Sequence, residues 1–292
     1  MIAALSIVAL MSAMVIYLFN DALPAVLHFG AGFFSSSAWD PVRDEFGGLP
    51  AIFGTLLTSA LAMIVAVPLG LGVAIFLVEL SPQWFQKPAS FLIEMLAAIP
   101  SVVLGLWALF VMVPVIRDPV EQWLGGSLGF LPFFRGPPLG VGFLSGALIL
   151  AVMTLPIIIA IAREALGSVP SSQREAMLAL GATRWEAINY AVLPYARSGI
   201  LAAVMLGLGR AVGETMAVTM VIGNGYQVTA NLFAPGNTMA SKIAAEFAEA
   251  SGELYVGSLI ELALILLAVT LVINVTGRLL VRKLATVPKG GE

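Results

Sequence analysis

The sequence predicts an all-α membrane protein with six transmembrane helices and both termini in the cytoplasm. Three observations lead to this fold class: the composition, the length of the apolar stretches and the distribution of Lys and Arg. Hydrophobic residues make up 60% of the 292 residues and charged residues only 11%, with a mean hydropathy of +1.00. Soluble domains usually carry about 25% charged residues. So few charges cannot cover the surface of a soluble globule of this length.

The apolar residues gather into six stretches that each match the roughly 20 residues needed to cross a hydrocarbon core of about 30 Å. We expect a single transmembrane domain, 1–292, whose spans are 2–19, 49–80, 89–115, 141–161, 200–222 and 255–280. The second and third stretches exceed one span, so each either tilts or begins with a helix in the interface. The first lacks the basic region and the cleavage site of a signal peptide, which favours a span.

The orientation follows from Lys and Arg, which concentrate in cytoplasmic segments. With both termini inside, four basic residues fall outside: Arg43, Arg117, Arg135 and Lys242. Nine fall in the cytoplasm: Lys87, Arg163, Arg174, Arg184, Arg197, Arg278, Arg282, Lys283 and Lys289. Arg210 lies within a span. The inverted topology would place the basic excess outside, so we predict cytoplasmic termini.

The composition excludes several kinds of site. The chain has no cysteine and only one histidine, His28, so thiolate sites and multi-histidine metal sites are excluded. A net charge of −3 does not indicate a nucleic-acid partner. There is no phosphate-binding loop of ATPases and no nucleophile–histidine pair. We therefore expect no catalytic residue, no metal and no cofactor bound by this chain.

Long connections on the outer side are ordered loops by composition, since they combine Gly, Pro, Trp and Asp. They cover 20–48, 116–140 and 223–254. Within the last, residues 238–250 carry Ile243 and Phe247 four apart with polar residues between them. This spacing predicts a short interfacial helix, either a packing element or a lid over an outer vestibule.

The connection between the fourth and fifth spans predicts a cytoplasmic elbow over about 165–196. Ser172 followed by Glu175 is the pattern of a capping box that starts a helix, and so is Thr183 followed by Glu186. Gly181 between them supplies the left-handed position that ends the first helix. The second stretch is expected to run to about Val192. The elbow is either a plain hairpin that joins two spans or a rigid element on which another protein acts.

The spacing within this elbow resembles the EAA motif of ATP-binding-cassette (ABC) importer permeases. The matching positions are Glu175, Ala176, Gly181, Ala182, Leu193 and Pro194. Met177 and Ala191 depart from the usual Ala and Ile, and both substitutes are apolar. The resemblance implies a type I importer permease fold and a coupling helix that sits in a groove on an ATPase subunit.

Two charges lie within the fifth predicted span. Arg210 is about 18 Å and Glu214 about 24 Å from its inner end, counted at 1.5 Å per residue. A charge at the membrane centre needs a partner or a wet cavity. A spacing of four lets the two side chains meet on one helical face. A ridge of small residues predicts that this face packs against neighbours: Gly199, Ala203, Gly207 and Ala211.

These charges have two interpretations. They form either a buried ion pair that fixes helix packing, or a transport pathway in which Arg210 attracts an anion and Glu214 holds the arginine. Glu94, about 9 Å into the third predicted span, is expected to serve as a second partner for a basic group. Glu79, Glu164 and Glu261 lie nearer span ends, where we expect most of them to be solvated or paired.

The whole chain also resembles the C-type permeases of phosphate-specific ABC importers, within the binding-protein-dependent transport permease family. The matching segments are Trp-Asp-Pro at 39–41 and residues 46–50, 54–56, 66–70, 99–103, 209–217 and 232–236. The resemblance implies a phosphate importer of the bacterial or archaeal plasma membrane. It further implies an A-type permease as heterodimer partner, two ATPase subunits that use ATP, and an extracytoplasmic phosphate-binding protein. It also implicates Arg210 and Glu214 in transport.

By physical argument alone, a secondary, ion-coupled anion transporter is the alternative. Such a protein would not need the elbow, and it would work without ATP. A membrane-embedded enzyme is a poorer third, because no catalytic constellation is present. The residues do not separate phosphate from another tetrahedral oxyanion; only the resemblance does.

Overall fold

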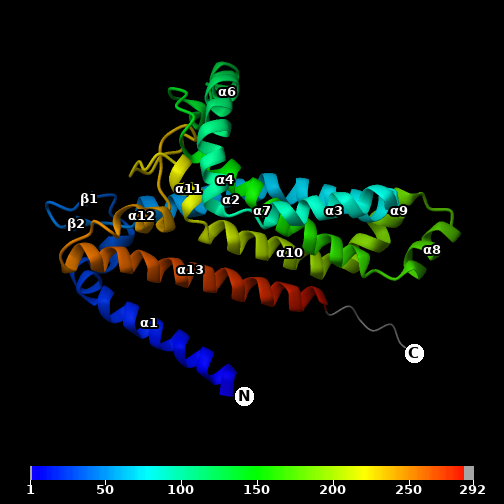
Figure 1. The fold of residues 1–292 in the computed structure, drawn as a ribbon, viewed down its shortest axis with the longest axis horizontal. Helices are drawn as coiled ribbons and strands as arrows, with labels where there is room; N and C mark the ends of the chain where they lie inside the picture. Colours follow the sequence, from blue (N-terminus) through cyan, green and yellow to red (C-terminus); the bar gives the residue numbers. More distant parts are fainter. Residues whose placement is uncertain (1, 286–292) are drawn as a thin grey trace. The chain divides into compact units, whose positions relative to one another are not determined.

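The computed structural model describes residues 2–285, and these are mostly helical (Figure 1). The long helices are α1 (Ile2–Phe29), α2 (Leu49–Ile75), α7 (Phe143–Gly167), α10 (Leu193–Gly213) and α13 (Glu253–Ala285). The shorter α-helices are α3 (Gln83–Ala97), α4 (Ser101–Trp107), α5 (Val113–Val115), α6 (Gln122–Leu128), α8 (Ser171–Ala179), α9 (Arg184–Ala187), α11 (Met216–Val221) and α12 (Met239–Glu246). Lys289, one of the nine basic residues expected in the cytoplasm, lies outside the described residues.

The remaining elements are short. Strands β1 (Trp39–Asp40) and β2 (Glu45–Phe46) pair antiparallel. The 3-10 segments are η1 (Gly30–Phe34) and η5 (Pro132–Phe134). Widened π-helical turns form η2 (Phe76–Leu80), η3 (Ala108–Met112), η4 (Ile116–Glu121) and η6 (Ile188–Val192).

Six helical stretches of the described chain are long and apolar enough to cross a membrane. They are Leu5–Phe34, Leu49–Leu80, Ser101–Leu128, Phe143–Gly167, Arg184–Gly213 and Glu253–Lys283. The predicted fold class, an all-α protein with six membrane-spanning helices, is confirmed. The first stretch ends at Phe34 instead of residue 19, and two others differ more substantially from the prediction.

The third predicted span, 89–115, is wrong in its boundaries. Helix α3 ends at Ala97, and the third candidate span starts only at Ser101. The separation falls at Pro100, which has no N–H to continue a helix and disfavours helical backbone at the preceding residue. The apolar stretch from 89 to 115 therefore contains the end of one short helix and the beginning of a separate span.

The boundaries of the fifth predicted span, 200–222, are also wrong. Helices α9, η6 and α10 run together from Arg184 to Gly213, so the chain does not leave the helix before Pro194. The widened turn η6 ends at Val192, two residues before Pro194. It accommodates the backbone carbonyl that is left without a donor because Pro194 has no N–H. At the other end, Glu214 and Thr215 separate α10 from α11. The Thr215 hydroxyl donates to the Gly213 carbonyl at 3.3 Å, a local contact that competes with helix continuation.

The helices cluster into two compact units, each assembled from three parts of the chain. Unit 1 comprises Met1–Ala60, Ser101–Ile149 and Val212–Thr270, and unit 2 comprises Leu61–Pro100, Leu150–Ala211 and Leu271–Glu292. A buried cluster in unit 1 joins the β1–β2 hairpin to three helices. Its members are Phe33, Phe46, Ala51, Met239 and Leu262.

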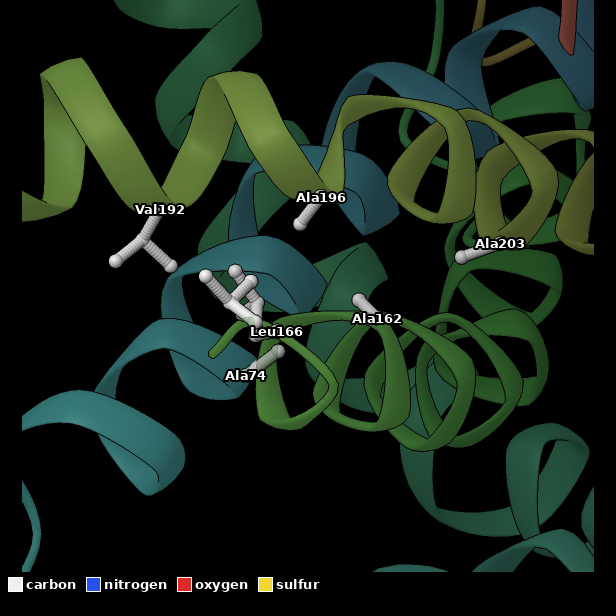
Figure 2. Close-up of a cluster of buried hydrophobic side chains, with 7 residues drawn as sticks. Ala74, Ala162, Leu166, Val192, Ala196 and Ala203 are labelled. Carbon is white, nitrogen blue, oxygen red and sulfur yellow. The ribbon is translucent and has the colours of Figure 1, made fainter. Parts of the chain in front are cut away.

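Unit 2 contains a cluster of mainly small buried side chains between α2, α7 and α10 (Figure 2). Its members are Ala74, Ala162, Leu166, Val169, Val192, Ala196 and Ala203. The predicted small-residue ridge faces this contact. A Cβ on Gly199 would collide with Ala165, and one on Gly207 would lie 2.8 Å from Ile158. The ridge therefore lets α10 approach α7 closely.

Candidate functional site

The elbow forms around the end of helix α8, and Gly181 makes this helix end possible. Helix α8 ends at Ala179, Leu180 is its C-cap, and Gly181 comes next with φ +85°. The Gly181 N–H donates to the Leu178 carbonyl at 3.0 Å, and the Ala182 N–H donates to the Met177 carbonyl at 3.1 Å. This pair of bonds is a Schellman motif, which needs a left-handed residue where Gly181 stands. The predicted helix end is confirmed.

Of the two predicted capping boxes, one is confirmed and one is wrong. The Thr183 hydroxyl accepts from the Glu186 N–H at 3.3 Å, while the Glu186 carboxylate accepts from the Thr183 N–H at 2.7 Å. Ser172 makes no such cap, because α8 already begins at Ser171 with Pro170 at its N-cap. Ser172 thus lies inside the first turn, where its side chain is past the capping position.

The residues that the motif picks out differ in exposure. Glu175, Ala176, Gly181 and Pro194 are exposed, whereas Ala182 and Leu193 are half-buried. Leu193 packs against the buried cluster of unit 2. The exposed members are thus accessible to another protein, and Leu193 instead fixes the elbow to the helices beneath it.

Three large apolar side chains at the end of α8 and around Gly181 are exposed, and the sequence interpretation did not include them. Leu180 is 85% exposed, Trp185 57% and Leu178 46%. Leu180 and Trp185 flank the Gly181 turn, outside the α8 helix. Exposed apolar side chains gathered on one element mark an interaction surface. Their position beside Gly181 is the signal that could have identified them.

An ion pair fixes the elbow to the end of the second span. The Arg174 guanidinium of α8 places Nη2 2.6 Å from Glu79 Oε1. It also donates to the Val169 carbonyl at 2.6 Å and the Leu166 carbonyl at 3.1 Å. These two carbonyls lie at and just beyond the end of α7, where carbonyls lack helical partners. A hollow of about 170 Å³ lies beside the pair. The sequence interpretation treated Arg174 only as a cytoplasmic charge.

Glu94 has the basic partner that its position suggested. The Arg163 Nη2 lies 2.8 Å from Glu94 Oε1, and the Glu94 side chain is 57% exposed. Both line a hollow of about 400 Å³ together with Lys87 and Ser90. Exposed pairs of this kind contribute little to stability. A role for Glu94 in transport stays a prediction.

Arg210 and Glu214 do not share a continuous helix as predicted. Arg210 lies in the last turn of α10, where the negative end of the helix dipole favours a cation. Its side chain is exposed in this chain, whereas Ala203 of the small-residue ridge is buried. Glu214 lies beyond the helix, in the break before α11, and is 8% exposed. Arg210 belongs to unit 2 and Glu214 to unit 1.

Two carboxyl groups in candidate spans of unit 1 are buried, contrary to the expectation for Glu261. Glu261 is 4% exposed and its Oε2 has no hydrogen-bond partner among the described residues. Glu121 is 1% exposed and accepts from the Gly140 N–H at 2.8 Å.

In unit 1, a polar cluster fixes the predicted outer helix, which forms as α12. The Lys242 ammonium lies 2.5 Å from Glu246 Oε1 and over the rings of Trp39 and Tyr226, at 4.6 and 4.4 Å from their centroids. Glu246 also accepts from Trp39 Nε1 at 2.8 Å and from the Tyr255 hydroxyl at 2.9 Å. Burial lowers the pKa of Lys242, against the opposing effect of Glu246. Burial raises the pKa of Tyr226, and the negative charge of Glu246 raises it further.

Comparison with known proteins identifies the family. Residues 66–286 match the family described as the binding-protein-dependent transport system inner membrane component. The chain belongs to this family. The matched region includes the elbow, Arg210 and Glu214, and the six candidate spans agree with a multi-pass protein of the inner membrane.

Relatives extend over nearly the whole chain. The phosphate transport system permease protein PstC of Mesorhizobium japonicum is 43% identical, over 97% of this chain and 88% of its own length. PstC of Haemophilus influenzae is 42% identical, over 96% and 90%. A probable PstC of the archaeon Methanocaldococcus jannaschii is 37% identical, over 89% and 84%.

Solved structures of ABC transporters share the fold at low sequence identity. A bacterial ABC transporter involved in import of the polysaccharide alginate matches with a TM-score of 0.59 at 17% identity, over 95% of each chain. The MetNI methionine ABC transporter in an inward-facing conformation matches with a TM-score of 0.59 at 18% identity, over 80% of this chain and 94% of that chain. The fold is thus that of an ABC importer permease.

Proposed function

We propose that this chain is the transmembrane permease subunit of an ATP-driven importer of inorganic phosphate. The elbow is the observation that carries the proposal. It presents exposed apolar side chains on a turn defined by Gly181, and Arg174 connects it to the ends of two spans. The phosphate cargo is supported by relatives named phosphate transport permeases at 42–43% identity over almost the full chain.

In this proposal the elbow receives the motion of a cytoplasmic ATPase. The chain has no phosphate-binding loop, so a partner subunit binds and hydrolyses ATP. A displacement of α8 acts on Glu79 and on the end of α7, because the Arg174 guanidinium holds all three segments together. The expected assembly contains an A-type permease, two ATPase subunits and an extracytoplasmic phosphate-binding protein.

The transport pathway is proposed to use Arg210, Glu214 and Glu94. A guanidinium attracts an oxyanion and matches its oxygens with paired donors. The exposure of Arg210 in this chain supports access for an anion. Glu214, buried in the break between α10 and α11, supplies a carboxylate in the same stretch of sequence.

Reconstitution tests the proposal. Liposomes that contain both permeases and the ATPase, with the binding protein outside, are expected to accumulate labelled phosphate only when ATP is present on the ATPase side. An excess of sulfate should compete poorly, whereas preferential competition by sulfate would point to another oxyanion. Phosphate accumulation by this chain alone, driven by a proton gradient, would establish the secondary-transporter alternative and overturn the proposal.

A further inference from the structure

A groove in unit 2 lies between α10 and the C-terminal part of α13. It has a volume of about 650 Å³. Ala202, Met205 and Leu206 of α10 line one side, so this wall is apolar. Gly277 of α13 lets the helices meet, because a Cβ there would lie 2.7 Å from the Met205 methyl carbon. The groove therefore lies between two closely packed membrane helices and has one apolar wall.

The end of this groove is basic. Arg278 and Arg282 of α13 line it, and their spacing of four places them on one helical face. Both are exposed, and among the described residues neither forms an ion pair with a carboxylate. Helix α10 has no acidic residue, and α13 has none after Glu261. The two guanidinium groups thus carry a positive charge that neither helix balances.

We propose that this groove binds an anionic phospholipid, with its phosphate on Arg278 and Arg282 and an acyl chain along the α10 wall. Guanidinium groups pair with phosphate oxygens through charge-assisted hydrogen bonds, and basic pockets between membrane helices suit anionic headgroups. A lipid matches both parts of the groove, the apolar wall and the cationic end. Free phosphate matches only the arginines. The proposal does not depend on the cargo that the transporter carries.

The amount of lipid that the purified transporter retains tests the proposed binding of an anionic phospholipid directly. The assembled transporter is reconstituted into nanodiscs of equal phosphatidylcholine and phosphatidylglycerol, extracted into detergent and purified, and the retained lipid is quantified by mass spectrometry. Wild type is expected to retain phosphatidylglycerol in preference to phosphatidylcholine. Arg278→Gln combined with Arg282→Gln should lower this retention by about tenfold, because both phosphate contacts are lost. Should the double variant not assemble, Arg278→Gln carries the same test with a smaller loss.

Two control variants make the outcome specific. Arg197→Gln removes an exposed arginine of α10 outside the groove and should leave retention unchanged; an equal loss there would overturn the proposal. Ala202→Phe fills the apolar wall and leaves both arginines, so it should also lower retention of phosphatidylglycerol. Unchanged retention in Ala202→Phe, with displacement of the lipid by inorganic phosphate, would assign the arginines to free phosphate. Equal retention of both lipids by wild type, or retention of neither because a partner subunit covers the groove, would likewise overturn it.

Discussion

Arg174 and Glu79, 95 residues apart in sequence, form a forked ion pair in which Nη2 lies 2.6 Å from Oε1 and Nε lies 3.1 Å from both carboxylate oxygens. The Glu79 side chain is 9% exposed and that of Arg174 25%. The same guanidinium reaches two carbonyls at the end of α7. One side chain thus connects the elbow to two membrane helices, which gives a docked protein a direct mechanical connection to the spans.

Loss of the Arg174 fork should uncouple the elbow from the spans. Arg174→Lys keeps the charge but cannot donate to Glu79 and two carbonyls in the same planar geometry. We expect phosphate uptake per assembled complex to fall at least fivefold and unfolding to become easier by about 2 kcal/mol, since one partner of a largely buried pair is poorly satisfied. The control is Arg197→Gln, which changes an exposed arginine of α10 outside the elbow and away from the Arg174–Glu79 pair. Uptake near the wild-type level in Arg174→Lys would exclude a coupling role.

Gly181→Val should misplace the docking surface without affecting insertion of the spans. No atom lies within 4 Å of a Cβ built there, so the cost is conformational and comes from φ +85°, at about 1 kcal/mol or more. Co-purification of the ATPase and phosphate uptake should both fall. Gly181→Asn should be milder, because Asn tolerates this conformation. Gly72→Val, at an exposed helical glycine with equally open space, is the matched control.

A double substitution separates the pathway role of Arg210 from a packing role. Arg210→Gln with Glu214→Gln removes both charges while keeping similar volume. If the two residues serve only as a structural pair, removal of both partners should be close to neutral for stability. If Arg210 meets the anion, the assembled double variant should lose labelled phosphate uptake, and Arg210→Lys should be intermediate at best. Near-normal uptake by the double variant, normalised to assembled complex, would limit both residues to packing.

The Lys242 cluster should respond to single and double substitutions differently. Lys242→Met leaves the half-buried Glu246 with only the Trp39 and Tyr255 donors, so the thermal midpoint of the detergent-solubilised protein should fall, by an equivalent of about 2 kcal/mol. Adding Glu246→Gln removes the uncompensated charge and retains an acceptor for both donors. The double variant should therefore recover most of the lost stability, and an additive loss would contradict this account.

The stability contribution of Lys242 should rise with pH. Burial lowers its pKa in the folded protein below the ordinary value of about 10.4, so between these two values the unfolded chain binds more protons. The stability difference between wild type and Lys242→Met should grow through that window, and a flat or decreasing difference would contradict the burial effect. The measurement stays below about pH 10, where tyrosines of the unfolded chain, including Tyr226 with its raised folded pKa, begin to ionise.

Features that depend on neighbours in sequence could be predicted from sequence. Apolar length indicates a membrane span whatever the tertiary structure, which explains the agreement on six spans. The Gly181 turn and the Thr183 cap involve contacts over a few residues, so their local patterns were sufficient. The ridge of Gly199 and Gly207 could also be recognised, because helical periodicity alone places these residues on one face.

Features that depend on packing were decided only by the tertiary structure. The helix breaks at Pro100 and Glu214 have local causes, but they fall inside continuous apolar stretches, where hydropathy alone does not reveal them. The pairing of Arg174 with Glu79 and the burial of Lys242 between Trp39 and Tyr226 join segments far apart in the chain. Such contacts form because the folded helices bring these side chains together and exclude water around them. The spacing of the residues in the sequence does not indicate which of them will be close in the folded protein.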